Sequence, residues 1–328
     1  MRMRTSWIKS MLALGIVLIF SAVNLTAQSL NEAGELFNKG IQLTSAEDYE
    51  GAIAAYEQCI SMCDKLGDEG DDLKARAFAI LPDLHYRAGL ALYRNKKVAE
   101  SIPRLEKAAA VAKEYGDNAT EAKINKLIPQ LYYAVGSASY KKDEFEKALV
   151  DLNKAIALDP EYSKPYLIIA LSYSKLDRLE EMREALDKAI QLGTQEGDEK
   201  SVNTARDAGY KTFLNRGQRA IQSSKFAEAE GHLITATQYE ANNASLQYLL
   251  AVTYNKLGKT DEAIAAATKS IELEEDANEK RAAAYFELGT AYKAKGDNVQ
   301  ACAAFKKALF GPNAEAAKYQ IEQELKCN

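Results

Sequence analysis

Residues 132–192 hold the same pattern of large and small side chains twice in succession: YYAVGSASYKKDEFEKALVDLNKAIALDPEYSKPYLIIALSYSKLDRLEEMREALDKAIQL. The first copy consists of Tyr132, Val135, Gly136, Tyr140, Phe145, Ala148, Leu152 and Ala155. The second copy, 34 residues later, consists of Tyr166, Ile169, Ala170, Ser174, Leu179, Met182, Leu186 and Ala189. Apolar residues spaced by three and four on both sides of a polar break at 141–143 are typical of two amphipathic helices joined by a tight turn. The stretch therefore predicts a repeated helix–turn–helix unit.

The last copy of the pattern is the most complete. It consists of Tyr285, Leu288, Gly289, Tyr292, Ala301 and Phe305. The small side chains let neighbouring helices approach each other, and the aromatic rings fill the space that remains. Apart from Tyr285, which replaces Trp, these residues match the pattern W-x2-L-G-x2-Y…A-x3-F. The chain therefore resembles the tetratricopeptide repeat (TPR) family over about residues 31–327.

The resemblance implies an all-α fold, a right-handed α-solenoid that occupies residues 28–327 of the chain. We expect about seven TPR-like repeats, at approximately 33–66, 82–115, 129–162, 163–196, 210–243, 244–277 and 282–312. A single capping helix over 313–327 should follow, because a solenoid otherwise exposes the apolar face of its last repeat. Its residues Ala317, Tyr319, Ile321 and Leu325 are expected to face the array.

Three of the repeats are expected to have extended first helices. The extra residues at 72–81 and 119–128 have helical patterns, and a third insert begins at Gly197 and Asp198. Pro82 and Pro129 directly follow the first two extensions. Because proline removes a backbone donor, it predicts a kink or a restart of the helix at each place.

Residues 1–27 have the form of a secretory signal peptide. Basic residues precede an apolar run over 11–20, and the small residue Ala27 ends the segment. An uncleaved membrane anchor is the alternative, but the run is shorter than the roughly 20 residues that span a bilayer. We therefore expect an exported protein, periplasmic or secreted, that has no integral membrane span after cleavage near Ala27.

The charge balance argues against a nucleic-acid partner. The full chain has a formal net charge of −5, and removing three basic residues with segment 1–27 gives −5 − 3 = −8. Binding to a phosphate backbone needs a concentrated basic face, which this composition does not offer.

No pattern in the sequence indicates catalysis, a metal or a cofactor. The only histidines, His85 and His232, lie in different repeats, and neither has further ligands at the spacing of a zinc site. Phosphate-binding glycine loops and nucleophile elbows are also missing from the sequence. We therefore expect a protein that is not an enzyme and that needs no cofactor.

The four cysteines lie in two regions of the sequence, two in the first repeat and two near the C-terminal end. Cys59 and Cys63 are four residues apart on one predicted helix, which separates their β-carbons by about 5–6 Å, too far for a disulfide. Cys302 lies in the second helix of the last repeat, and a turn at Gly311 sends the capping helix back beside it. Cys327 would then arrive near Cys302, so we expect a disulfide between them.

The family resemblance also implies a binding surface. The first helices of a TPR array line its concave face, so side chains that flank the packing positions on those helices are the binding candidates. They are Phe37, Tyr86, Tyr93, Tyr133, Tyr140, Leu167, Leu171, Tyr248 and Phe286, with Lys141, Lys175 and Lys256 at the helix ends. The alternative is that these tyrosines pack between helices.

These observations predict a non-catalytic scaffold of the cell envelope that binds protein or peptide segments in its concave groove. The alternative is a structural envelope component that binds cell-wall glycan or associates with itself. Aromatic side chains also stack on sugars, so the groove residues are compatible with both functions.

Overall fold

The computed structural model of the chain describes residues 28–275 and 279–327. Every regular element in these two ranges is helical, and they contain no β-strand. The chain divides between Tyr162 and Ser163 into two compact units, called unit 1 and unit 2 in chain order. The predicted signal segment, residues 1–27, lies outside the described residues.

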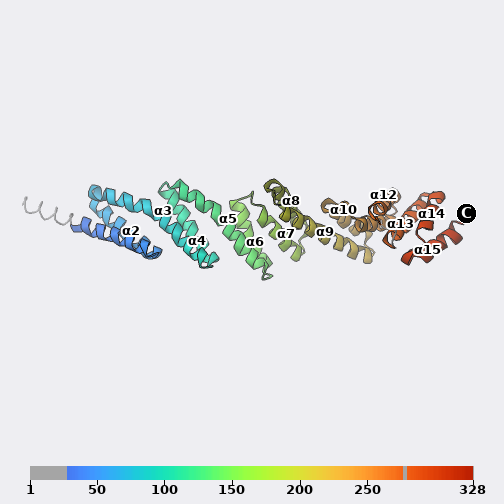
Figure 1. Ribbon diagram of the computed structural model, residues 1–328, viewed down its shortest axis with the longest axis horizontal. Coiled ribbons are helices and arrows are strands. Elements are labelled where there is room, and N and C mark those ends of the chain that lie inside the picture. Colours follow the sequence, from blue (N-terminus) through green and yellow to red (C-terminus); the bar gives the residue numbers. More distant parts are fainter. Residues whose placement is uncertain (1–27, 276–278, 328) are drawn as a thin grey trace, which may run out of the picture. The chain divides into compact units, whose positions relative to one another are not determined.

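Unit 1 contains three helix pairs, and helices that follow each other in sequence lie side by side (Figure 1). Its helices are the one over 28–45, α2 (Tyr49–Leu66), α3 (Asp71–Arg94), α4 (Val98–Glu114), α5 (Asn118–Tyr140) and α6 (Phe145–Leu158). A short 3-10 turn, Gly67–Gly70, joins α2 to α3.

Unit 2 contains four helix pairs and a terminal cap. Its paired helices are α7 (Ser163–Lys175), α8 (Leu179–Glu196), α9 (Glu199–Gln222), α10 (Phe226–Tyr239), α11 (Ala244–Leu257), α12 (Thr260–Leu273), α13 (Glu279–Lys295) and α14 (Asn298–Lys307). The cap consists of a 3-10 turn Gly311–Asn313, helix α15 (Ala314–Tyr319) and a π-helical turn Gln320–Glu324.

The predicted all-α solenoid with three extended first helices is confirmed. The extended helices α3, α5 and α9 have 24, 23 and 24 residues, whereas α7 and α11 have 13 and 14. Within each unit, first helices of neighbouring pairs contact each other: α3 with α5, α7 with α9, and α9 and α13 with α11. Second helices do not contact one another to a comparable extent in the described residues. The first helices therefore lie on the inside of each stack, and we call their solvent-facing surface the inner face.

A close approach of the two helices fixes the geometry of most pairs. A β-carbon on Gly136 of α5 would lie 2.6 Å from Leu152 of α6, and one on Gly289 of α13 would lie 2.8 Å from Phe305 of α14. Carbon atoms in contact are normally about 3.5–4.0 Å apart, so only glycine permits these pairs. The small residues of the repeat pattern thus let a large side chain from the second helix pack directly on the first helix.

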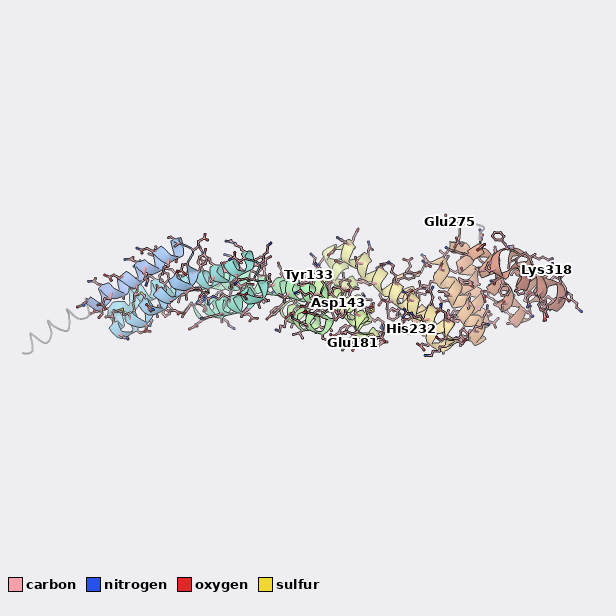
Figure 2. The ribbon with its side chains drawn as sticks, turned by 90° about the horizontal axis from the view of Figure 1, so that it is seen from below. Tyr133, Asp143, Glu181, His232, Glu275 and Lys318 are labelled. Carbon is pink, nitrogen blue, oxygen red and sulfur yellow. A yellow bond between two sulfur atoms is a disulfide. The ribbon has the colours of Figure 1, made fainter. Side chains whose placement is uncertain are left out.

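The turn inside each pair contains one residue in the left-handed conformation. In the last two pairs this residue is Gly258 or Gly296. In the first five it is not glycine: Glu47, Lys96, Asp143 (labelled in Figure 2), Asp177 and Ser224 have φ between 58° and 63°. A side chain in this conformation contacts the following carbonyl, which costs about 1–2 kcal/mol per residue. Packing of the helix pairs must therefore offset strain in five turns.

The long helices α5 and α9 begin in the same way. Gly116 and Gly197, with φ of 72° and 73°, end the preceding helices in the left-handed conformation. Asp117 then accepts a hydrogen bond from the backbone N–H of Thr120 at 3.0 Å, and Asp198 accepts the equivalent bond from Ser201 at 3.1 Å. Hydrogen bonds from the side chains of Thr120 and Ser201, together with these backbone bonds, lower the pKa of both aspartates. The Gly-Asp pairs found in the sequence therefore mark helix starts.

The predicted helix restarts at Pro82 and Pro129 do not occur. Helix α3 continues through Pro82 and α5 through Pro129. A proline inside a helix costs about 3 kcal/mol. Burying one leucine-sized side chain contributes about 1.5–3 kcal/mol, and Leu81, Leu84 and their counterparts beside Pro129 are buried. Tertiary packing therefore outweighs the local effect of proline.

The cap departs from the single helix expected over 313–327. Ala317 is buried, and Ile321 and Leu325 pack against the core between α13 and α14, as expected. Tyr319, in contrast, is 54% exposed. It follows Ala317 by two residues, about 200° around an α-helix, so the two side chains face opposite directions. The expectation that Tyr319 faces the array is wrong.

The cysteines occupy two different environments. Cys302 on α14 and Cys327 at the end of the cap form a disulfide, with Cα atoms 5.8 Å apart. Cys59 and Cys63 are free and buried in α2. The structure thus contains the pairing that the helix geometry predicts and leaves the other two cysteines as core residues.

The core of unit 1 contains a buried histidine. His85 on α3 is 1% exposed, and its Nδ1 makes no hydrogen bond within the described residues. Burial, together with the nearby cations Arg104 and Lys107 on α4, lowers the pKa of His85 to about 4. The imidazole is therefore neutral in the folded protein at neutral pH.

The turn strain predicts that glycine at position 96 stabilises the protein. Lys96→Gly relieves about 1–2 kcal/mol of left-handed strain and adds about 0.5–1 kcal/mol of backbone entropy cost. The free energy of unfolding should therefore rise by about 0.5–1 kcal/mol. Gly258→Ala, at the equivalent turn with φ of 72°, should lower it by a similar amount. Urea unfolding followed by circular dichroism measures both changes, and no gain for Lys96→Gly would contradict this account.

The buried histidine predicts loss of stability in acid. The folded pKa of about 4 lies below the ordinary value of 6.5, so the unfolded chain binds the proton first as pH falls. Stability is fully present above about pH 6.5 and should decrease by about 2 kcal/mol by pH 5. Comparing urea unfolding at pH 7.5 and 5.0 for wild type and His85→Gln isolates the contribution of His85 to the pH dependence of the free energy of unfolding.

Candidate functional site

A pocket of about 370 Å³ lies in unit 2, lined by residues of the first helices α9, α11 and α13, of the end of the second helix α12, and of the turn that contains Pro312. Three successive first helices supply parts of its wall: Gln218 from α9, Tyr248 from α11 and Ala283 from α13. The complete lining is Gln218, Ala244, Ser245, Tyr248, Leu249, Ser270, Glu274, Glu279, Lys280, Ala283 and Pro312. A side chain of a partner that entered this pocket would therefore contact three repeats at once.

The lining of the pocket combines apolar side chains with polar and charged ones. Ser270 uses its hydroxyl to donate to the carbonyl of Ala244 at 2.9 Å, which leaves the hydroxyl engaged within the wall. Tyr248 is half-buried, and desolvation together with the nearby Glu287 raises the pKa of its phenol. The tyrosine thus remains neutral, with an apolar ring and a hydroxyl available for hydrogen bonding.

Glu287 lies beside this pocket, on α13. Asn255 of α11 donates from Nδ2 to the Glu287 carboxylate at 2.7 Å and to its backbone carbonyl at 3.0 Å. Burial nevertheless raises the pKa of Glu287, outweighing the lowering effect of Asn255 and Lys256. Glu287 thus joins α11 to α13 through Asn255, in a partly buried position.

The predicted groove residue Phe37 is not on the surface. Its side chain is 6% exposed and packs edge-on against Tyr56, with ring centroids 5.2 Å apart. The guanidinium of Arg76 covers the ring at 4.8 Å from the centroid. The assignment of Phe37 to the groove is therefore corrected: it is a core residue of the first helix pair.

The four predicted tyrosines of unit 1 differ in accessibility. Tyr93 is 44% exposed on α3, whereas Tyr86 and Tyr133 pack in part against the core between α4 and α5. Tyr133, labelled in Figure 2, also contacts the ring of Tyr162 at 5.5 Å. Tyr140 packs against Phe145 at 5.6 Å, and burial raises its pKa. Of this set, Tyr93 offers the largest free ring.

The remaining candidates divide in the same way. Leu167 and Leu171 are half-buried on α7, and Tyr248 lines the pocket. Phe286 packs edge-on against Phe305, with ring centroids 5.5 Å apart, so most of its contacts are internal. The three lysines of the set, Lys141, Lys175 and Lys256, are exposed.

Sequence reasoning identified Tyr248 but not the rest of the pocket. Gln218, Ala283 and Pro312 are separated by many residues in the chain and meet only because helix pairs stack. Gln218 follows Gly217, the glycine of its repeat pattern, by one residue. Ala283 precedes Gly289, the glycine of its own repeat, by six residues. The repeat register was therefore the signal that could have placed them on the inner face.

The described residues do not bring their metal-ligating side chains together. They contain no group of three or more His, Cys, Asp or Glu side chains that could hold a metal ion. His232, on α10, lies beside Glu228 at 3.8 Å and near the ring of Phe213. Among the same residues, no helix has the length and apolar composition that crossing a membrane requires.

Family models described as tetratricopeptide repeat match much of the chain. One matches residues 214–278, and another matches 129–162, 163–192 and 282–309. These ranges coincide with helix pairs of the structure. No curated protein sequence matches the chain.

Several solved structures are similar to parts of the chain. MamA is 23% identical, with a TM-score of 0.33, over 60% of this chain and 95% of that chain. YrrB, described as a TPR protein with an unusual peptide-binding site, is 20% identical, with a TM-score of 0.34, over 58% of this chain and 91% of that chain. A tetratricopeptide repeat protein from Parabacteroides merdae is 22% identical, with a TM-score of 0.30, over 92% of this chain and 100% of that chain.

The family follows from the repeat matches and from the structure of the matched segments. In three of the matched ranges a glycine of the first helix lies directly against a large residue of the second: Gly136 against Leu152, Gly217 against Leu233 and Gly289 against Phe305. TPR proteins are in general non-catalytic scaffolds for protein interactions, and the helical fold supports this role here. The chain belongs to the tetratricopeptide repeat family.

Proposed function

We propose that the chain is an exported, non-catalytic scaffold of the cell envelope that binds an extended protein segment on its inner face. The observation that carries the proposal is the pocket of about 370 Å³, which is lined in part by three successive first helices. A pocket of this size accepts one large side chain of a partner. A partner strand that runs across α9, α11 and α13 would be held at the pocket and at the surfaces beside it.

Tyrosine at position 248 suits such a role. Its ring provides a large rigid contact, and its hydroxyl can donate to a peptide carbonyl. Gln218 and Ser245 add amide and hydroxyl groups that pair with a peptide backbone. The pocket thus combines apolar side chains with a few polar groups, which is typical of sites that recognise peptide segments.

The envelope setting of the proposal depends on the first 27 residues. Their basic start, short apolar run and final Ala27 support export and cleavage. The disulfide between Cys302 and Cys327 is compatible with an oxidising compartment outside the cytosol. The proposed partner is therefore a protein that reaches the same compartment.

Binding is predicted to depend on Tyr248. Peptides selected from a phage-displayed random library on the mature chain serve as the probe, with affinities measured by fluorescence anisotropy. Tyr248→Ala should weaken binding by about 10- to 30-fold, the effect of removing a central aromatic contact. Tyr93→Ala tests the inner face of unit 1 in the same way.

The control for this experiment is Tyr319→Ala. Tyr319 is 54% exposed but lies on α15, away from the pocket lining. Its removal should leave peptide affinity unchanged. Equal affinity of wild type and Tyr248→Ala would contradict the proposed site. If the protein sediments together with isolated cell-wall glycan, and Tyr248→Ala does not change this, the result would instead favour the structural envelope role.

Export predicts a shortened mature protein. Intact-mass measurement on protein from its native host should give a chain that begins close to Gln28, because a signal peptidase cleaves after a small residue such as Ala27. The control is the same gene expressed without residues 1–27 in the cytosol, which fixes the expected mass. A full-length mass in a membrane fraction would refute cleavage.

A further inference from the structure

The cap at the end of unit 2 is too small to stay folded by itself. Helix α15 has six residues, and the π-helical turn after it has five. Isolated helices shorter than about 12–15 residues are marginal in water. Residues 314–327, which we call the lid, therefore depend on contacts with α13 and α14.

These contacts cover the apolar side of the last helix pair. Ala317 is fully buried, and Ile321 and Leu325 are partly buried. They pack on a cluster formed by Ala301, Phe305 and Ala308 of the α14 segment together with Tyr285, Phe286 and Tyr292 of α13. The lid thus contributes only one fully buried side chain, an alanine, to this cluster.

Two hydrogen bonds from Lys293 and one disulfide add to the apolar contacts between the lid and the last helix pair. Lys293 of α13 donates to Gln320 Oε1 at 2.7 Å and to Glu324 Oε2 at 3.3 Å. Both acceptors belong to the lid, and Lys293 and Glu324 are partly exposed, so water weakens this pair. The disulfide between Cys302 and Cys327 is the remaining tie and closes a 25-residue separation.

The backbone beside the disulfide is strained. Lys326 has φ of 50°. This value lies in the left-handed region, which residues other than glycine rarely adopt. Unlike the five strained turns inside helix pairs, this residue is not followed by a helix that packs on the array. Such a conformation persists only where the surrounding structure imposes it. Here Cys327 donates its backbone N–H to the carbonyl of Ile321 at 2.9 Å, and its side chain forms the disulfide, so both hold the chain on either side of this conformation.

We propose that the Cys302–Cys327 disulfide is a redox latch that holds the lid closed over the last helix pair. A dithiol reductant transfers two electrons and two protons to the disulfide. The sulfur–sulfur bond breaks, Cys302 and Cys327 become thiols, and the reductant becomes a disulfide. Both cysteines are partly exposed, so a reductant can reach them. Reduction removes the covalent link between the end of the lid and α14 and leaves the lid held by its noncovalent contacts with α13 and α14.

Release of the lid changes the surface of the protein. Ala301, Phe305 and Ala308 lose the cover of Ala317, Ile321 and Leu325 and become accessible at the end of unit 2. The turn Gly311–Asn313 packs separately on α13, where Gly311 lies against Glu279. Opening should therefore begin after Asn313 and leave the remaining helix pairs folded.

Hydrogen exchange measured by mass spectrometry on the full mature chain tests the latch. Oxidised protein, protein treated with dithiothreitol, and the variant Cys302→Ser/Cys327→Ser are compared. Amides of 315–325 should exchange at least about 10-fold faster in the reduced protein and in the variant, because the closed lid no longer protects them. Exchange in α11 and α12 should stay unchanged.

The other cysteine pair supplies the matched control. Cys59→Ala/Cys63→Ala removes the buried thiols of α2 and keeps the latch, so its lid should respond to dithiothreitol as in wild type. Equal lid exchange before and after reduction would overturn the proposal. Accelerated exchange throughout α13 and α14 would also overturn it, since the disulfide would then staple the whole pair. Two free thiols at Cys302 and Cys327 under air oxidation would exclude the latch directly.

Discussion

The structure depends on the close approach of two helices at a small residue. A β-carbon at Gly89, Gly136, Gly217 or Gly289 would lie between 2.5 and 2.8 Å from a leucine or phenylalanine of the paired helix. Because the large side chain lies directly on the first helix, it fixes the distance between the two helices of a pair and their relative position along the helix axis. The orientation of the pairs then places the same positions of every first helix on the inside of a stack. The pocket at Tyr248 follows from this arrangement.

Helix packing in this chain is strong enough to hold locally unfavourable backbone. Five non-glycine residues adopt left-handed φ in the turns, and three prolines, Pro82, Pro103 and Pro129, lie inside helices. Rules based on neighbouring residues would forbid or interrupt these segments. They persist because the helices on both sides are buried along one face over many residues. The same packing holds His85 neutral between α3 and α4.

Features encoded by spacing along one helix could be predicted from the sequence, whereas features that depend on neighbouring helices could not. The three extended helices follow from a helical pattern and a Gly-Asp start. The pairing of Cys302 with Cys327 follows from an antiparallel return of known length. Phe37 was misplaced because its face is decided by Tyr56 and Arg76, which come from two other helices. The pocket was missed for the same reason, since no single segment contains more than a part of its wall.

Among the residues that the structure describes, the first and the last helix pair each contact a neighbouring pair on one side, and both have further stabilising contacts. In a stack, a helix pair gains most of its stability from contacts with adjacent pairs, so the last pair has about half of these contacts. The first pair is joined to α3 by the contact of Phe37 with Arg76 and by the salt bridge between Lys74 and Asp64. The last pair has no such following helix pair, and a short cap with a single fully buried alanine replaces it. A covalent bond compensates for the small apolar area of that cap. The position of the disulfide at this end is therefore explained by the same nearest-neighbour packing that forms the rest of the fold.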